Sequence, residues 1–218
     1  MLIRPADRPL DESEWRTFIE DHDFGQLIVP AGDGPPVVVP THFVVDSNGA
    51  VLFHLAADNP VFEALRAART VTFAVVGAYT YVPTDWNANP GADPRYGIPT
   101  SYYGAVQLSG EAAIIDDPEG LAQILALQLA HFQPEAGHAP VEPGDGPYGR
   151  ALAHIRGVRL TIQVVTAKFK FGGNKTADHR LAIADRLEAR GGPRDLEARG
   201  HLLRRLRARD REGGTGKA

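Results

Sequence analysis

The sequence predicts a mainly β protein, α+β by content, whose strands form an antiparallel barrel or sandwich. Apolar runs of strand length recur along its 218 residues, and most of them end at Gly, Pro, Asn or Asp. The helical segments do not alternate regularly with these strands, as they would in a parallel sheet. We expect one main domain over residues 1–175, C-terminal helices over 176–210 packed on the barrel or on a partner subunit, and a flexible tail over 211–218.

Capping and turn residues predict the first elements. Asp11 can cap a short helix, and Glu14 can complete a capping box with it. Strands are expected over residues 26–29, 37–45 and 51–55. Asn48-Gly49 predicts a hairpin turn between the last two strands, because this pair tolerates positive φ angles. Asn59-Pro60 marks the start of the next helix, whose free N–H groups suit a phosphate.

The second half of the chain alternates long strands with loops that are rich in Pro and Gly. Strands are expected over 71–76 with a continuation over 79–82, over 101–111 and over 158–171. Residues 84–99 are expected to form a long loop, and loops of this length in compact domains are commonly functional or disordered. Helices are expected over 118–131, then from Gly173 to the break at Gly191-Gly192-Pro193, and over 194–209.

The composition excludes several classes of protein. A formal net charge of -4 argues against a nucleic-acid or membrane-surface binder as a whole. The absence of cysteine removes disulfides and thiolate metal sites. No signal peptide is recognisable, and no apolar run approaches the roughly 20 residues of a membrane span, so we expect a soluble cytoplasmic protein. The eight histidines are scattered without metal-ligand spacing, and we expect no metal site.

Four polar clusters carry the candidate chemistry. They are Thr41-His42, the segment from His54 to Pro60, the segment from Pro99 to Tyr103, and the segment from Lys168 to Thr176. Each also has an ordinary interpretation as a polar strand edge, a helix cap, a solvated strand face or a turn. Lysine and phenylalanine alternate over residues 168–171, which places both lysines on one face of a strand. The order of the four clusters along the chain is more specific than any one of them.

In that order the segments resemble the PaiB family, the FMN-binding negative transcriptional regulators of the split-barrel flavoprotein superfamily. The resemblance runs from about His22 to Arg190. The similar segments are Thr41-His42-Phe43-Val44 (family Thr-His-Leu-Pro), His54-Leu55-Ala56-Ala57-Asp58-Asn59-Pro60 (His-x-Ala-x-x-Asn-Pro), Pro99-Thr100-Ser101-Tyr102-Tyr103 (Pro-Thr-Trp-Asn-Tyr) and Lys168-Phe169-Lys170-Phe171-Gly172-Gly173-Asn174-Lys175 (Lys-Phe-Lys-Leu-Ser-Gln-Asn-Lys). The chain departs from the family pattern at Tyr79, at Ser101-Tyr102 and at Gly172-Gly173.

The resemblance implies a homodimer of Greek-key split barrels, with peripheral helices and FMN in the cleft between the subunits. It assigns Lys170, Asn174, Lys175 and Thr41 to the phosphate side of the cofactor. Thr100, Tyr102 and the backbone near Val44 are expected along the flavin ring, and Asn59 at the helix start completes the expected cofactor-binding set. His42 and His54 belong to the same set and are the candidates for proton transfer, because histidine titrates near neutral pH.

The function itself has three interpretations. The family resemblance implies a negative transcriptional regulator, and the C-terminal segment from Arg186 onward, with ten basic and five acidic residues, is its candidate DNA contact. The wider superfamily implies an FMN-dependent oxidoreductase on a small molecule, similar to flavin reductases or pyridoxamine oxidases. A haem-binding split barrel is the third interpretation, with His42, His54 or His131 as the axial ligand.

Overall fold

Seven strands form one sheet in the order β2-β1-β5-β6-β7-β4-β3. The computed structural model describes the backbone of residues 1–214 and the side chains of residues 1–208. The strands are β1 (Phe24–Val29), β2 (Val37–His42), β3 (Val44–Val45), β4 (Val51–Ala56), β5 (Val71–Val82), β6 (Thr100–Ile115) and β7 (Ile155–Lys170). β1 pairs antiparallel with β2 and β5, and β4 pairs antiparallel with β3 and β7. The predicted antiparallel α+β fold is therefore confirmed.

Seven α-helices and two 3-10 turns accompany the sheet within the described residues. The helices are α1 (Glu12–Asp21), α2 (Val61–Ala67), α3 (Thr84–Asn87), α4 (Pro118–Phe132), α5 (Pro147–Leu152), α6 (Ala177–Arg190) and α7 (Asp195–Gly214), and the 3-10 turns are η1 (Pro5–Asp7) and η2 (Pro94–Tyr96). Over the same residues, none of the helices combines the length and the apolar character that crossing a membrane requires.

The chain divides into two compact units. We call residues 19–75 and 107–166 the barrel unit, since it holds β1 to β4 together with α2, α4 and α5. We call residues 1–18, 76–106 and 167 onward the helical unit, since it holds α3, α6, α7 and most of α1. The strands β5, β6 and β7 each contribute one segment to either unit.

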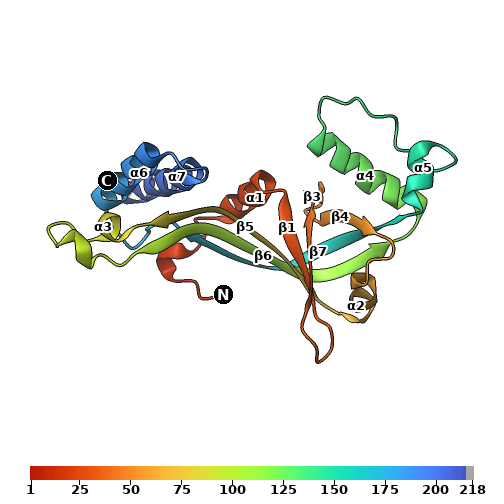
Figure 1. The fold of residues 1–218 in the computed structure, drawn as a ribbon, viewed down its shortest axis with the longest axis horizontal. Coiled ribbons are helices and arrows are strands. Elements are labelled where there is room, and N and C mark those ends of the chain that lie inside the picture. The colour runs from red at the N-terminus through yellow and green to blue at the C-terminus, as the bar shows by residue number, and fades with distance from the viewer. Residues whose placement is uncertain (215–218) are drawn as a thin grey trace. The chain divides into compact units, whose positions relative to one another are not determined.

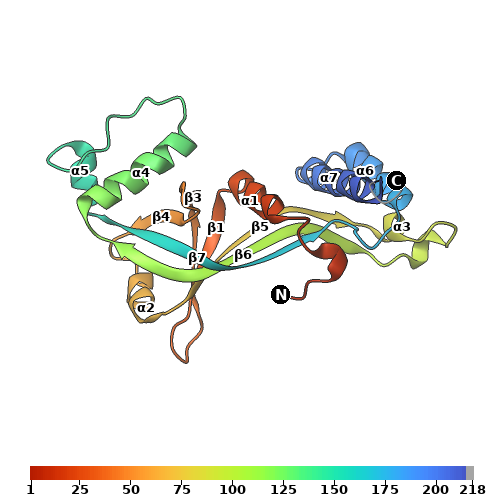
Figure 2. The ribbon, with the colours of Figure 1, turned by 180° about the vertical axis from the view of Figure 1, so that it is seen from behind.

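The sheet of the barrel unit curls back on itself. β2 lies at one edge of the strand order and β4 lies next to the other edge, yet these two strands are in contact. The interior is filled by Phe43, Phe53 and Phe73, with ring centroids 4.8 and 5.4 Å apart for the pairs 43–73 and 53–73. Burial of each ring is worth roughly 1.5–3 kcal/mol, so this cluster is a main source of stability for the unit. Above and below β4, α4 and α2 flank the unit (Figures 1 and 2).

In the helical unit, α6 and α7 lie side by side (Figure 1). Asp195, at the start of α7, accepts hydrogen bonds from Arg190 at 2.6 and 2.7 Å, from the Thr80 hydroxyl at 2.5 Å and from the Gly192 amide at 2.8 Å. The Arg190 guanidinium also lies 4.6 Å from the ring centroid of Trp86. One buried carboxylate therefore connects β5, the end of α6 and the start of α7.

A second buried carboxylate connects α1 to α7. Glu14 and Arg205 form an ion pair at 2.6 Å, and their side chains are only 3% and 6% exposed. Arg205 also donates to the backbone oxygens of Ala6 and Arg8 at 3.2 and 2.8 Å. The Glu14 carboxylate accepts the Leu10 amide at 2.6 Å. This pair thus fixes the N-terminal segment, α1 and α7 as one assembly.

The structure differs from the sequence expectations at several boundaries. The strand expected over 37–45 is interrupted at Phe43, whose amide bonds to the oxygen of Asp23 and not to a neighbouring strand. The Asp11 carboxylate accepts a hydrogen bond from the Glu14 amide at 3.1 Å, as expected for a helix cap. The Glu14 carboxylate instead binds Arg205 and the Leu10 amide, so the expected capping box is not completed. The elements α3, η2 and α5 are additional to those expected from the sequence. Two expected elements are longer, since β6 continues to Ile115 and α7 continues to Gly214. Of the predicted tail 211–218, residues 215–218 lie outside the described residues.

We predict that Asp195→Asn lowers the free energy of unfolding by about 1–3 kcal/mol at neutral pH, because it removes a charged acceptor of several buried hydrogen bonds. The Arg190 hydrogen bonds hold the pKa of the Asp195 carboxyl well below its usual range. A carboxyl with a lowered folded pKa contributes stability above its unfolded pKa, and this contribution is lost as the pH falls below it. Urea unfolding should therefore show a variant penalty that shrinks between about pH 6 and about pH 3.

The exposed Asp185 on α6 provides the matched control, since Asp185→Asn removes a carboxylate from the same helix pair. We expect that control to unfold like the unmodified protein. An Asp195→Asn penalty that is absent at neutral pH, or that is unchanged at acid pH, would contradict the role assigned to this carboxylate.

Candidate functional site

A cavity of about 630 Å³ lies in the helical unit. Five of the ten predicted cofactor-binding residues line it, namely Thr100, Tyr102, Lys170, Asn174 and Lys175. Its other charged lining residues are Arg4, Asp7 and Lys168, so that four cations face one carboxylate. A cavity of this size and charge suits a small organic anion.

The end of β7 supplies the cationic wall of this cavity. Lys168 and Lys170 project from one face of the strand while Phe169 and Phe171 are fully buried on the other, as the sequence alternation predicts. Lys170 Nζ donates to the Thr100 hydroxyl at 2.6 Å, and Lys168 Nζ donates to the Leu2 oxygen at 3.0 Å. An ammonium has three donors, so each of these lysines keeps donors for an anion after its protein contact is made.

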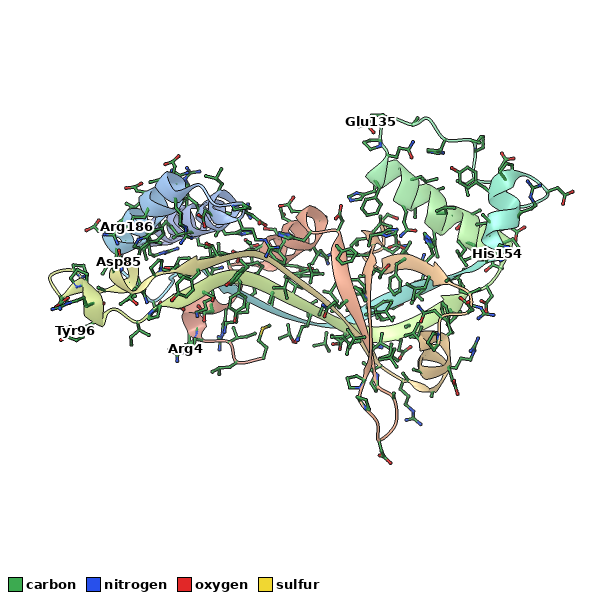
Figure 3. All side chains as sticks on the ribbon, viewed as in Figure 1. Arg4, Asp85, Tyr96, Glu135, His154 and Arg186 are labelled. Atoms are coloured by element: carbon green, nitrogen blue, oxygen red, sulfur yellow. The ribbon has the colours of Figure 1, made fainter. Side chains whose placement is uncertain are left out.

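Lys175 connects the cavity to the loop between α3 and β6. Its Nζ donates to the Asn87 oxygen at 3.1 Å and to Asn89 Oδ1 at 3.3 Å, and both asparagines line the cavity. Tyr96, which Figure 3 places near the far end of this loop, is 79% exposed and also belongs to the lining. The loop expected over 84–99 is therefore part of the cavity wall. Its base is held by a bond from Arg186 to the Asp85 oxygen at 3.2 Å (Figure 3).

Tyr102 is a buried member of the cavity lining. It is 1% exposed, and its hydroxyl has no hydrogen-bond partner among the described side chains and backbone. Burial raises the pKa of this hydroxyl to about 12, so the phenol stays neutral at physiological pH. Gly172 adopts a φ of 69°, and a side chain there would overlap the Tyr102 hydroxyl. Positions 102 and 172, two of the five that depart from the PaiB pattern, are thus sterically coupled.

The two predicted proton-transfer residues meet in the barrel unit. His42 ends β2 and His54 lies in β4, so they come together where the sheet curls back, with ring centroids 5.7 Å apart and nearly perpendicular planes. Phe132 at the end of α4 packs against His42 at 5.0 Å. Burial lowers the pKa of His42, and the neighbouring His54 lowers it further. The negative charge of Asp23 has the opposite effect and raises this pKa, but it is the smallest of the three. His42 is therefore neutral near pH 7.

The other predicted residues are engaged within the barrel unit. Thr41 is buried and its hydroxyl donates to the His42 oxygen at 3.1 Å. Val44 belongs to an apolar cluster with Leu52 and Ile124. Asn59 accepts the Val61 amide at 3.0 Å, so its side chain caps α2, which has only seven residues. The assignment of these residues to the cofactor remains a prediction.

Sequence reasoning missed Gln128, which is the hydrogen-bond partner of His54. His54 Nδ1 lies 2.5 Å from Gln128 Oε1, and Gln128 is 2% exposed. A signal for it exists in the sequence, since Gln128 occupies a position that continues the buried face of Leu121 and Ile124 on α4. A glutamine at such a position indicates a buried polar contact. His131, the third haem-ligand candidate, pairs with Asp23 at 3.1 Å.

The basic residues of the C-terminal helices are largely occupied by internal contacts. Arg190 and Arg199 form ion pairs with Asp195 and Glu188, and Arg205 is buried against Glu14. Exposed arginines with described side chains remain at positions 194, 204 and 207. The segment therefore offers phosphates fewer free cations than its composition predicts. Arg209, Arg211 and Lys217 have side chains outside the described residues.

A family model described as "Putative FMN-binding domain" matches residues 1–164. The search of curated proteins gave no match. Among solved structures, the flavocytochrome Anf3 from Azotobacter vinelandii is 16% identical with a TM-score of 0.59, over 79% of this chain and 74% of that one. The FAD and heme binding protein from Mycobacterium smegmatis is 16% identical with a TM-score of 0.59, over 80% and 78% of the two chains. At this identity the similarity establishes the fold, which is that of flavin split barrels.

We predict that Tyr102→Phe leaves stability near neutral pH almost unchanged, because the hydroxyl that it removes makes no hydrogen bond. A tyrosine with a raised folded pKa contributes stability below its unfolded pKa of 10, and this contribution is lost as the pH rises toward 12. The unmodified protein should therefore lose stability between about pH 9 and about pH 11.5 more steeply than the variant does. Urea unfolding at both pH values measures the difference, and equal slopes would refute the assignment.

Proposed function

The chain belongs to this FMN-binding family and has FMN as its cofactor, and from this premise we propose that it is a flavin-dependent redox protein acting on a small molecule. The observation that carries the proposal is the cationic cavity of the helical unit, which is lined by five of the residues that the family resemblance assigns to the cofactor. Bound FMN supplies reversible electron and hydride transfer at its ring system. The protein must bind it, orient it and handle protons.

The cavity has the donors that a phosphate monoester requires. We assign the phosphate contacts to Lys170 and Lys175, with Asn174 beside them at the exposed turn before α6. Thr100 fixes the Lys170 ammonium from the neighbouring strand, so less side-chain freedom is lost on binding. Tyr102 contributes a neutral aromatic wall. The volume of about 630 Å³ lies in the range of roughly 300–1,000 Å³ that is usual for cofactor pockets.

We assign proton handling to His42 and His54 of the barrel unit. Both rings are half-buried and in contact with one another, and histidine is the side chain that exchanges protons near neutral pH. The lowered pKa of His42 keeps this ring neutral and able to accept a proton. We further propose that the chain is a PaiB-type cytoplasmic homodimer, as the collinear motifs imply.

Transcriptional regulation is the second candidate. Among the described side chains, Arg194, Arg204 and Arg207 are the candidates for phosphate contacts, since their neighbours Arg190, Arg199 and Arg205 are engaged in ion pairs. Binding of DNA that weakens as the salt concentration rises would favour this function. Haem binding through His42 or His54 is the third candidate, and a Soret absorption band would favour it.

We predict that Lys170→Ala and Lys175→Ala each weaken FMN binding by about 10- to 100-fold, because a charge-assisted hydrogen bond is worth about 1.5–3 kcal/mol. Fluorescence titration of the apoproteins with FMN measures the dissociation constants. Arg69→Ala, which removes an exposed cation from the barrel unit, should bind FMN like the unmodified protein.

Two results would remove the proposal. If all three variants bind FMN equally, the cavity of the helical unit is not the phosphate site. If the unmodified protein itself neither retains nor takes up FMN, the assignment of a flavin-dependent function fails as a whole.

A further inference from the structure

We infer that Gln128 is a positioning residue that fixes His54 in its Nδ1–H tautomer, so that Nε2 is the atom of this ring that accepts a proton. The inference rests on the proposed function for His54 but concerns a residue outside the predicted site. It starts from the contact between His54 Nδ1 and Gln128 Oε1 at 2.5 Å. An amide oxygen only accepts hydrogen bonds, so the histidine donates from Nδ1.

The fold holds α4 at the distance that this contact needs. His54 in β4 pairs with Gly157 in β7, so the two residues are direct cross-strand neighbours. A side chain on residue 157 would lie 2.5 Å from Ile124 Cδ1 and 3.1 Å from Ile115 Cβ. Because Gly157 has no side chain, Ile124 can pack onto the sheet. Gln128 lies one helical turn after Ile124 and therefore reaches His54.

The burial of Gln128 argues that its amide serves more than stability. The residue is 2% exposed, and its Nε2 has no hydrogen-bond partner among the described residues. A half-satisfied buried amide stabilises a fold less than an apolar side chain of similar volume would. The benefit of Gln128 therefore lies in its one close contact, which is with the imidazole of His54.

The groups around His54 are the ring of His42, the ring of Phe132 and the carboxylate of Asp23. His42 faces it from β2, and burial together with the neighbouring His54 lowers the pKa of His42. The carboxylate of Asp23 acts on His42 by its charge, and it pairs with His131 of α4 at 3.1 Å. The remaining contact of the His42 ring is the apolar Phe132. The pair thus presents one neutral ring beside one ring whose tautomer is fixed by an amide.

Long-range ¹H–¹⁵N correlation spectra of the full chain, labelled in its histidines, measure the tautomer of His54 directly. Spectra are recorded at about pH 8, where unperturbed imidazole is neutral, with His54→Gln to assign the signals. We expect the Nδ1–H form in the unmodified protein. In Gln128→Leu the ratio of Nδ1–H to Nε2–H should fall about tenfold, which corresponds to the loss of one hydrogen bond. Gln128→Glu retains an acceptor and should restore the Nδ1–H form.

Two further variants separate positioning from a general effect on packing. Gln123→Leu alters an exposed glutamine of the same helix and should leave the tautomer unchanged. Gly157→Val leaves Gln128 itself unchanged but crowds Ile124 and so displaces α4, and it should lower the ratio as Gln128→Leu does. Thermal unfolding of Gln128→Leu should occur at or above the temperature of the unmodified protein, because a half-satisfied buried amide has been removed.

The inference is overturned if His54 of the unmodified protein is in the Nε2–H form, or if Gln128→Leu and Gly157→Val both leave the ratio unchanged. FMN titration of the same samples keeps the proposed function separate. A protein that shows the expected tautomers but binds no FMN would retain the positioning role of Gln128 and lose the proposed function.

Discussion

The buried ion pair between Glu14 and Arg205 is the interaction on which the cavity of the helical unit depends. The guanidinium of Arg205 binds the Glu14 carboxylate and the backbone oxygens of Ala6 and Arg8. Ala6 and the adjacent Asp7 line the cavity, and Arg205 holds this part of the wall while Lys168 holds Leu2. Removal of one partner from a buried pair leaves an uncompensated charge, which is more costly than the pair itself is stabilising. The arrangement thus couples the C-terminal helix to the shape of a site on β6 and β7.

Under the proposed function, the cavity of the helical unit supplies positive charge and the histidine pair of the barrel unit exchanges protons. The lysines that line the cavity lie on one face of β7 and in the turn after it, and their positive charges suit the binding of an anion. The histidine pair lies where β2 meets β4, with Phe132 packed against His42 and the buried amide of Gln128 bonded to His54. These contacts orient both rings and so fix the positions of their protons. Each arrangement is produced by local packing within its own unit.

Residues that act through local patterns could be predicted from the sequence, and residues that act through distant partners could not. The alternation over 168–171 predicted that Lys168 and Lys170 share one face of a strand, and both lysines line the cavity together with Asn174 and Lys175. The cofactor roles of Lys170, Asn174 and Lys175 come from the family resemblance and stay a prediction. By contrast, Gln128 and His54 are 74 positions apart, and Glu14 and Arg205 are 191 apart. No local pattern names such partners, because they meet only after the strands have paired and the helices have docked. The same limit explains Glu14, whose local signal for a capping box was outweighed by a buried arginine.

The most direct test of the account is the ratio of the affinities for FMN and riboflavin, which differ only by the phosphate. Fluorescence titration of the apoprotein with each ligand gives this ratio, and the account predicts that FMN binds at least about tenfold more tightly, as expected when a phosphate gains charge-assisted hydrogen bonds. In Lys170→Ala the ratio should fall toward one. A protein that binds both flavins equally, or whose preference for FMN survives the loss of Lys170, would contradict the assignment of the cationic cavity to the cofactor phosphate.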